Sequence, residues 1–183
     1  MRLSILAAAL ALGFATPAAA QAPVSPVPVS APAPADVATP EAIVAALYDV
    51  ISGDAGVARD WDRFRSLFHS TARLAPSGAT REGQGVVRSI TPDEYITRSE
   101  PLLVAEGFHE REIARRPERF GRIVHVWSTY ESLHSLSDPQ PFARGINSIQ
   151  LFNDGARWWI ISVYWQAETP AAPIPAEYLP PTG

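Results

Sequence analysis

The segment Arg144–Glu168, RGINSIQLFNDGARWWIISVYWQAE, has two alternating apolar runs on either side of Asp154-Gly155. An Asp-Gly pair between such runs predicts a β-hairpin with a two-residue loop. Residues that lie opposite each other in a hairpin share one face of the sheet. The face predicted to point inward changes from apolar near the turn to polar at the far end. Its members are Leu151, Trp158, Ile149, Ile160, Asn147, Ser162, Gly145 and Tyr164.

The other face of this hairpin mixes polar side chains with two tryptophans, Trp159 and Trp165. Such a mixture is typical of a sheet face that is exposed, or partly covered by a second subunit. The assignment of both faces depends on the turn, because a shift of one residue moves every side chain to the opposite face.

The segment Arg122–Ser132 is rich in β-branched and aromatic residues and predicts the strand that precedes the hairpin. One set of alternating residues in it again changes from apolar to polar. We therefore expect Val124, Val126, Ser128 and Tyr130 to point inward.

The first half of the chain predicts helices. Thr39-Pro40 and Thr91-Pro92 are typical helix starts, with threonine as N-cap and proline in the first turn. Between them, the spacing of apolar residues in Val57–Phe68, including Trp61, predicts another helix. Tyr48 lies off the main apolar stripe of the first helix, where it could reach a cavity. Helices followed by a run of strands favour an α+β fold, with a curved antiparallel sheet covered by helices on one face.

The composition of the two ends differs from that of the centre. Residues 1–22 have the charge, apolar run and small residues of a secretory signal peptide, with cleavage after Ala20 or Ala22. Residues 23–38 are rich in proline and alanine and predict an extended linker. The folded domain is expected at 39–169. The Pro-rich tail at 170–183 is expected outside it, although Tyr178-Leu179 could dock on the domain. A signal peptide implies a secreted protein, which we expect to be periplasmic.

The hairpin and the elements before it also resemble those of a known protein family. Helices followed by a strand meander that contains DGARWWI and WQAE resemble the nuclear transport factor 2-like superfamily, which includes SnoaL-like cyclases, scytalone dehydratase and steroid Δ-isomerase. HVWSTYES and RGINSIQL are similar to a secreted bacterial branch whose function is unknown. The resemblance covers about Thr39 to Glu168. It implies a cone-shaped α+β domain with an internal cavity, in which Trp158 points into the cone.

In enzymes of that superfamily an Asp, His or Tyr inside the cone performs acid–base chemistry. No such motif transfers to this chain, and its last three strands have no inward carboxylate by alternation. Asp60 and Asp62 flank Trp61, where one could face the mouth of the cone, but a solvated helix face explains them more simply. The catalytic residues, and whether the protein is an enzyme, are left open.

Three functions are compatible with these patterns. The first is a secreted domain that binds a small apolar molecule. The second is a SnoaL-like hydro-lyase, isomerase or cyclase. The third is a homodimeric interaction domain that uses the outer sheet face and has no ligand. The candidate ligand-binding residues are Tyr48, Trp61, Ser128, Tyr130, Asn147, Trp158, Ser162 and Tyr164.

Other classes of partner are not expected. The four histidines are scattered and the chain has no cysteine, so we expect no metal site and no cofactor. A formal net charge of -4 does not favour a nucleic-acid partner. After the predicted signal peptide no apolar run is long enough to span a membrane, so no membrane association is expected after cleavage.

Overall fold

A computed structural model describes residues 31–181 of the chain. The predicted signal peptide and the first half of the predicted linker, residues 23–30, lie outside the described residues. The three helices are α1 (Pro40–Ile51), α2 (Trp61–Leu67) and α3 (Pro92–Glu106). The strands are β1 (Phe68–Ala79), β2 (Gly85–Val87), β3 (His109–Phe120), β4 (Ile123–Leu133), β5 (Ala143–Asn153) and β6 (Trp158–Ala167). Two short 3-10 helices, η1 (Pro34–Val37) and η2 (Ala176–Tyr178), flank this set.

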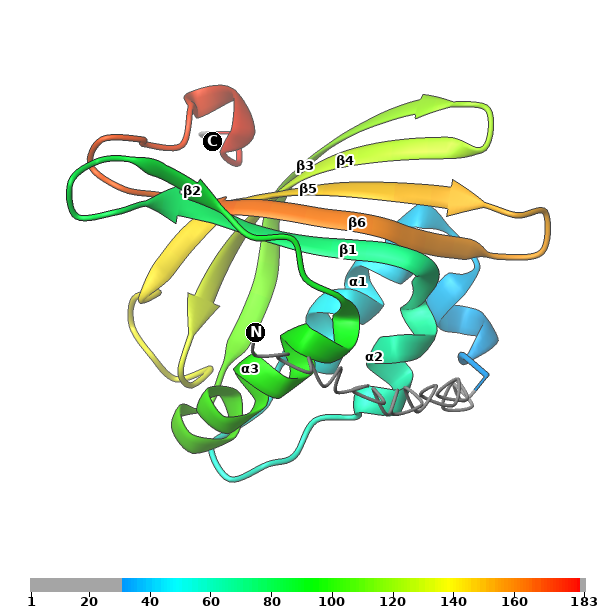
Figure 1. The fold of residues 1–183 in the computed structure, drawn as a ribbon, viewed down its shortest axis with the longest axis horizontal. Coiled ribbons are helices and arrows are strands. Elements are labelled where there is room, and N and C mark those ends of the chain that lie inside the picture. Colours follow the sequence, from blue (N-terminus) through cyan, green and yellow to red (C-terminus); the bar gives the residue numbers. More distant parts are fainter. Residues whose placement is uncertain (1–30, 182–183) are drawn as a thin grey trace, which may run out of the picture.

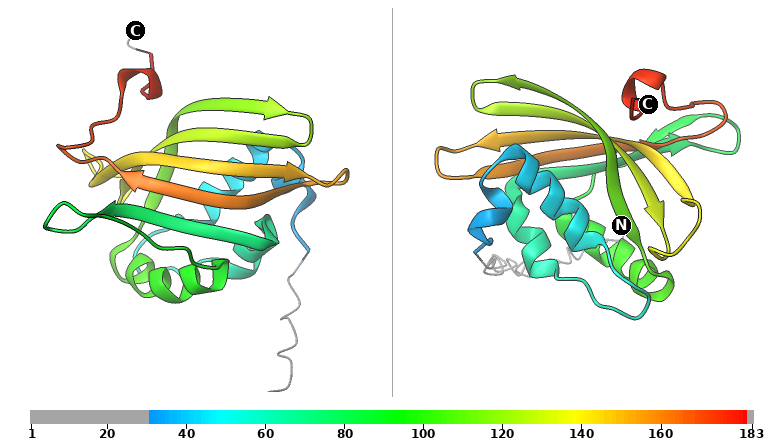
Figure 2. Two further views of the ribbon diagram at one scale, coloured as in Figure 1. Left: turned by 45° about the horizontal axis from the view of Figure 1, so that its top comes forward. Right: turned by 180° about the vertical axis from the view of Figure 1, so that it is seen from behind.

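The strands form one curved sheet in the order β2-β1-β6-β5-β4-β3. The three helices pack on its concave face, and the C-terminal segment lies on the other side (Figures 1 and 2). The sheet is mixed, because β1 and β6 run parallel. The predicted α+β class is therefore confirmed, while the prediction of a wholly antiparallel sheet is wrong. In the described part of the chain no helix is long and apolar enough to cross a membrane.

The predicted helix starts at Thr39 and Thr91 are confirmed. The side chain of Thr39 accepts a hydrogen bond from Ala42 N, and Thr91 forms a capping box with Glu94. The second helix begins at Trp61, later than predicted, because Asp60 caps it by accepting a hydrogen bond from Arg63 N. Val57 lies in the preceding loop and is 52% exposed.

A buried arginine connects the helices. The guanidinium of Arg59 donates hydrogen bonds to the carbonyl oxygens of Ile51, Gly53 and Leu103, at 3.0, 2.6 and 3.1 Å. The first of these carbonyls lies at the end of α1 and the last lies in α3. Arg59 therefore satisfies carbonyls that the helix end leaves without partners, and it fixes α1 relative to α3.

The β5–β6 hairpin has a four-residue loop, so the predicted two-residue loop is wrong. Asn153 pairs with Trp158, and the carboxylate of Asp154 accepts hydrogen bonds from Ala156 N and Arg157 N inside the loop. A hydrogen bond from Trp159 Nε1 and these backbone contacts lower the pKa of Asp154 to about 2. Because the pairing shifts by two residues, the predicted faces near the turn are unchanged.

Further from the turn, a β-bulge in β6 exchanges the inward and outward positions of this strand relative to the prediction. Leu151 pairs with Ile160 but Gln150 pairs with Ser162, so Ile161 is an extra residue on β6. Beyond this bulge Val163 and Trp165 point inward, and the predicted inward positions of Ser162 and Tyr164 are wrong. Tyr164 is 47% exposed.

Both ends of the predicted domain extend further than expected. In η1, Val37 is buried in the core and Asp36 forms an ion pair with Arg63 at 2.8 Å. At the other end, the carbonyl oxygen of Tyr178 accepts a hydrogen bond of 2.6 Å from the side chain of Thr129 on β4. The last residues of the predicted linker and much of the predicted tail therefore pack on the domain.

Candidate functional site

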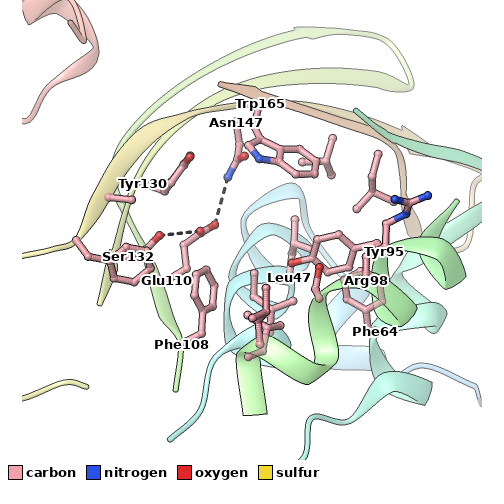
Figure 3. Close-up of a pocket in the computed structure, with 18 residues that line it drawn as sticks. Leu47, Phe64, Tyr95, Arg98, Phe108, Glu110, Tyr130, Ser132, Asn147 and Trp165 are labelled. Carbon is pink, nitrogen blue, oxygen red and sulfur yellow. Dashed lines mark hydrogen bonds between the residues drawn. The ribbon is translucent and has the colours of Figure 1, made fainter. Parts of the chain in front are cut away.

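A cavity of about 340 Å³ lies between the helices and the concave face of the sheet (Figure 3). This volume is at the lower end of the range, about 300–1,000 Å³, that is typical of ligand pockets. Its walls are mostly apolar and aromatic, with contributions from the three helices and from all five long strands. Among its lining residues only Arg98 and Glu110 are charged.

Glu110 points from β3 into the cavity. Its carboxylate accepts a hydrogen bond of 3.0 Å from Ser132 Oγ and a longer one of 3.5 Å from Asn147 Nδ2. Burial among apolar groups raises the pKa of Glu110 to about 7, against the opposing effect of these two hydrogen bonds. Near neutral pH this side chain therefore exists in both protonation states, and it can accept a proton as well as donate one.

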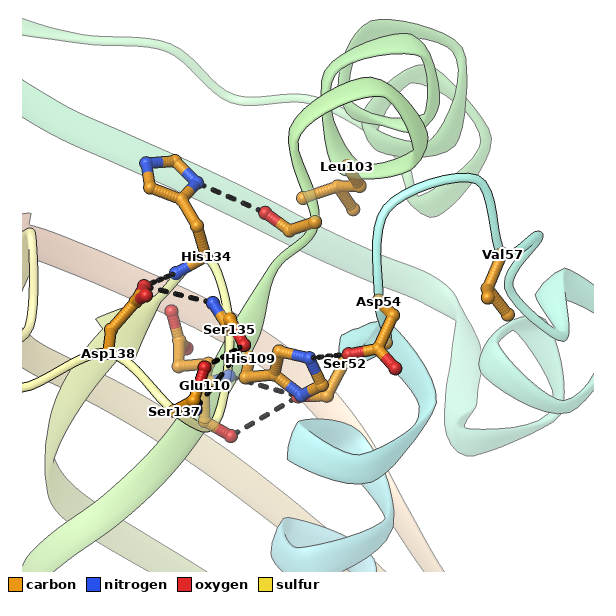
Figure 4. Close-up of polar contacts among 12 residues, drawn as sticks. Ser52, Asp54, Val57, Leu103, His109, Glu110, His134, Ser135, Ser137 and Asp138 are labelled. Atoms are coloured by element: carbon orange, nitrogen blue, oxygen red, sulfur yellow. Dashed lines mark hydrogen bonds and ion pairs between the residues drawn. The ribbon is translucent and has the colours of Figure 1, made fainter.

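The strand that carries Glu110 is fixed by its surroundings (Figure 4). The hydroxyl of Ser52 accepts a hydrogen bond from Glu110 N at 3.0 Å and donates one to Tyr48 O at the end of α1. His109, the preceding residue, contacts Asp54 Oδ1 through Nε2 at 2.8 Å. These contacts hold the start of β3 against α1, so that the carboxylate of Glu110 has a defined position.

The charge of Glu110 acts on three tyrosines. Burial, and next to it the negative charge of Glu110, raises the pKa of Tyr48, Tyr95 and Tyr130 well above the usual value for a phenol. All three therefore remain protonated and can act as hydrogen-bond donors. Figure 3 shows the hydroxyl of Tyr95 pointing from α3 into the cavity.

A chain of hydrogen bonds continues from the cavity into the core. Asn147 Nδ2 donates to the hydroxyl of Tyr48 at 3.0 Å, which lies 2.6 Å from Ser128 Oγ. Ser128 donates its only proton to Glu112 Oε1 at 2.5 Å, and Arg115 forms an ion pair with Glu112. Tyr48 must therefore donate to Ser128, because the proton of Ser128 is already used.

The mouth of the cavity is lined by apolar residues of α3 and of the segment before β5. Leu102 and Phe142 are 61% and 52% exposed there. The ring of Phe142 stacks on His134, with centroids 4.2 Å apart, and His134 Nδ1 donates to Gly107 O at 3.2 Å. The stacking on His134 therefore holds the Phe142 side of the cavity mouth in place.

Three solved structures with a similar fold are distant in sequence. One, a protein of unknown function with a cystatin-like fold from Nostoc punctiforme, is 10% identical, with a TM-score of 0.53 over 70% of this chain and 87% of that chain. A nuclear transport factor 2-like protein of unknown function from Silicibacter pomeroyi is 16% identical, with a TM-score of 0.47 over 72% and 94%. A Parabacteroides distasonis protein, provisionally named a ketosteroid isomerase, is 15% identical, with a TM-score of 0.47 over 72% and 89%.

The fold of the chain is similar to that of the Nostoc punctiforme protein, which is described as cystatin-like. The predicted α+β class, with helices on one face of a curved sheet, is confirmed by the described elements. No protein-family model and no curated protein matches the sequence. The similarity to solved structures therefore shows the fold alone.

The fold brings together only some of the eight predicted ligand-binding residues. Tyr130 and Asn147 line the cavity. Tyr48 and Ser128 are buried behind it, in the hydrogen-bonded chain. Trp158 does point into the cone, as predicted, but it is part of the packed core at 4% exposure.

The other three predicted residues lie away from the cavity. Ser162 and Tyr164 are on the outer sheet face because of the bulge in β6. Trp61, on the helical side of the domain, donates a hydrogen bond from Nε1 to Glu100 Oε1 at 2.8 Å. Asp60 and Asp62, its neighbours, form a helix cap and an ion pair with Arg65, in agreement with the simpler interpretation.

Glu110 is the main functional residue that was not predicted from the sequence. Inward carboxylates were excluded only for the last three strands, whereas Glu110 is on the strand before them. Its position follows from alternation, because Phe108, Glu110 and Glu112 share one face and Phe108 is apolar. Tyr95 and Trp165 were also not expected in the cavity.

Proposed function

We propose that this protein binds a small, largely apolar carbonyl compound in the cavity and moves a proton on it with Glu110. The observation that carries the proposal is a carboxylate with a pKa of about 7 at the wall of an apolar cavity. A general base works best when its pKa is close to the working pH. Glu110 meets this condition, while the protonated phenol of Tyr95 supplies a donor inside the same cavity.

The proposed reaction is an isomerisation. Ionised Glu110 removes a proton from a carbon next to the carbonyl group, and the electron pair of that C–H bond moves toward the carbonyl oxygen. Tyr95 stabilises the resulting enolate by donating a hydrogen bond to this oxygen. In a β,γ-unsaturated substrate, protonated Glu110 then returns the proton to the γ-carbon while the electron pair on oxygen re-forms the C=O bond. The C=C bond has thereby moved to the α,β position, and Glu110 is ionised again.

The test uses β,γ-unsaturated cyclic ketones, whose conversion to conjugated ketones is followed by ultraviolet absorbance. The wild-type protein should catalyse the conversion of at least one such ketone, and Glu110→Gln should reduce kcat by about 100-fold or more. Tyr95→Phe should reduce kcat by a smaller factor. Glu118→Gln is the matched control, because Glu118 carries an exposed carboxylate on β3, away from the cavity.

A passive binding domain is the second candidate. Ser132 and Asn147 each donate a hydrogen bond to the carboxylate of Glu110. Such contacts favour this candidate, because they are typical of a carboxylate with a structural role. In that case the wild-type protein would bind ketones without converting them, and Glu110→Gln would bind them equally well. Absence of both binding and conversion over a broad panel would contradict both candidates.

We also propose that the protein is exported, from the signal-peptide pattern of residues 1–22. Export to the periplasm of a bacterial host should yield a mature chain that begins at Gln21 or Pro23, as measured by mass spectrometry of the intact protein. A chain that keeps Met1–Ala20 after fractionation into cytoplasm and periplasm would contradict this proposal.

A further inference from the structure

Arg98 and Glu110 are the only charged residues that line the cavity, and they lie on different walls of it. Arg98 comes from α3 and Glu110 from β3, and Figure 3 shows their charged groups on opposite sides of the drawn cavity. Most of the other lining residues, such as Leu47, Phe64 and Trp165, have apolar or aromatic side chains, and the hydroxyl of Tyr95 also points into the cavity. The cavity thus has a basic side and an acidic side within a mostly apolar lining.

Arg98 forms no ion pair with an acid of its own helix, α3. Its charge does act on Glu94, one turn earlier, whose pKa is lowered by the hydrogen bond from Thr91 N and, to a smaller extent, by Arg98. Among the described residues no carboxylate oxygen lies within 4.0 Å of the nitrogens of Arg98, although α3 also carries acidic side chains. Asp93 pairs with Arg65 at 2.7 Å, and Glu94 accepts a hydrogen bond of 2.7 Å from Thr91 N in the capping box. Glu100 accepts one of 2.8 Å from Trp61. The nearby acids therefore have other partners, and the guanidinium of Arg98 remains available at the edge of the cavity.

We propose that the ligand of this cavity is a monoanionic amphiphile: an oxo carboxylic acid whose carboxylate binds Arg98 and whose apolar body fills the cavity toward Glu110. The inference rests on the proposed function and adds the class of substrate to it. A guanidinium presents two parallel N–H donors that match the two oxygens of a carboxylate. An unpaired arginine at the rim of an apolar cavity is therefore suited to the anionic end of such a molecule.

The two charges also determine the orientation of the ligand. A carboxylate placed at the inner end would lie beside the carboxylate of Glu110, and two like charges in an apolar environment repel each other strongly. The opposite orientation pairs the carboxylate with Arg98 and leaves the carbonyl-bearing carbons near Glu110. The arrangement therefore selects one orientation by attraction at one end and repulsion at the other.

The experiment measures the affinity of octanoate and of 1-octanol, which have the same chain length but differ in charge, by isothermal titration calorimetry at pH 8. The wild-type protein should bind octanoate at least tenfold more tightly than 1-octanol. Arg98→Gln should remove this preference by weakening octanoate alone, by about tenfold. Arg88→Gln is the matched control, because Arg88 is an exposed arginine that does not line the cavity.

The outcomes separate this inference from the proposed function. Equal affinity for octanoate and 1-octanol, or an octanoate affinity that Arg98→Gln leaves unchanged, would overturn the role of Arg98 while leaving Glu110 catalysis intact. A preference for octanoate that depends on Arg98, in a protein that isomerises no ketone, would support the inference and refute the proposed reaction. Failure to bind either probe would overturn the inference. Circular dichroism of Arg98→Gln excludes unfolding as the cause of weaker binding.

Discussion

The hydroxyl oxygen of Tyr130 lies 2.5 Å from the position that a β-carbon would occupy on Gly145, the residue opposite it on β5. Tyr130 is 5% exposed and forms part of the cavity wall. Only a residue without a side chain at position 145 leaves room for this ring. The shape of the inner wall thus depends on one glycine in the middle of the sheet.

Replacing Gly145 with alanine should therefore destabilise the protein by about 1–3 kcal/mol, because the new methyl group would overlap Tyr130 and the carbonyl oxygen of Gln166. Gly78→Ala on β1 is the control, since nothing lies within 4 Å of a β-carbon there. Urea unfolding of both variants measures the difference. Equal free energies of unfolding for the two variants would show that the close contact at Gly145 has no energetic importance.

Glu110→Gln should change how stability depends on pH. In the folded protein the pKa of Glu110 is raised to about 7, so the folded state holds its proton between about pH 4.5 and 7 while the unfolded state releases it. Wild-type stability due to this group is therefore highest below pH 4.5 and falls as the pH rises to 7. Relative to wild type, the glutamine variant should gain up to about 3 kcal/mol above pH 7.

This gain is measured by urea unfolding at pH 4.5 and pH 8, with Glu118→Gln as the exposed control. The difference between Glu110→Gln and wild type should be small at pH 4.5 and reach its full value at pH 8. A difference of the same size at both values would mean that Glu110 is not the titrating group.

Asn147→Ala should raise the pKa of Glu110 further, because Asn147 stabilises the ionised carboxylate by donating a hydrogen bond to it. The substitution also removes the donor to Tyr48, and a loss of about 2 kcal/mol in stability is expected. Carbon-13 NMR of labelled glutamate side chains reports the pKa directly. Asn153→Ala at the hairpin turn is the control and should leave the pKa of Glu110 as it is in the wild type.

Ligand binding should be reported by Trp165 and not by Trp159. Trp165 lines the cavity, whereas Trp159 lies on the outer face, where the guanidinium of Arg157 covers its ring at 3.6 Å from the centroid. Addition of octanoate should therefore change the tryptophan fluorescence of Trp159→Phe but have little effect on that of Trp165→Phe. The reverse result would place the binding site on the outer face of the sheet.

Removal of residues 170–183 should expose part of the outer sheet face. Tyr178 contacts Trp127 and Arg116 there, with ring centroids 5.8 Å apart in the first pair and the guanidinium 5.2 Å from the ring in the second. The predicted homodimer would use this face, so we expect the truncated protein to dimerise more readily than the full chain. Sedimentation velocity measures this change, with a chain that lacks only residues 181–183 as control. If the full chain forms a dimer and the truncated protein does not, the expectation is contradicted.

Much of the inner wall could be predicted from the sequence. Val124, Val126, Ser128 and Tyr130 are all buried on the predicted face of β4, because strict alternation in a strand leaves only two choices and the apolar residues decide between them. The helix starts at Thr39 and Thr91 depend on contacts within one helical turn, and for the same reason they could be predicted directly from the sequence. The fold class followed from the order of these elements.

Local patterns could not reveal the bulge at Ile161, which depends on how β6 pairs with β5 on one side and with β1 on the other. This single extra residue moves Tyr164 to the outer face and brings Trp165 into the cavity. The outer position of the C-terminal segment likewise depends on contacts between residues far apart along the chain, such as Thr129 and Tyr178.

The sequence by itself determined the helices, the strand meander and which residues of β4 point inward, because these depend on neighbours within a few positions along the chain. Only the tertiary structure decided that Glu110, Tyr95 and Asn147 meet around one cavity, since they come from three separate elements. The raised pKa of Glu110 also depends on the tertiary structure. It results from the apolar residues that the fold packs around the carboxylate, and no segment of the chain contains that environment alone.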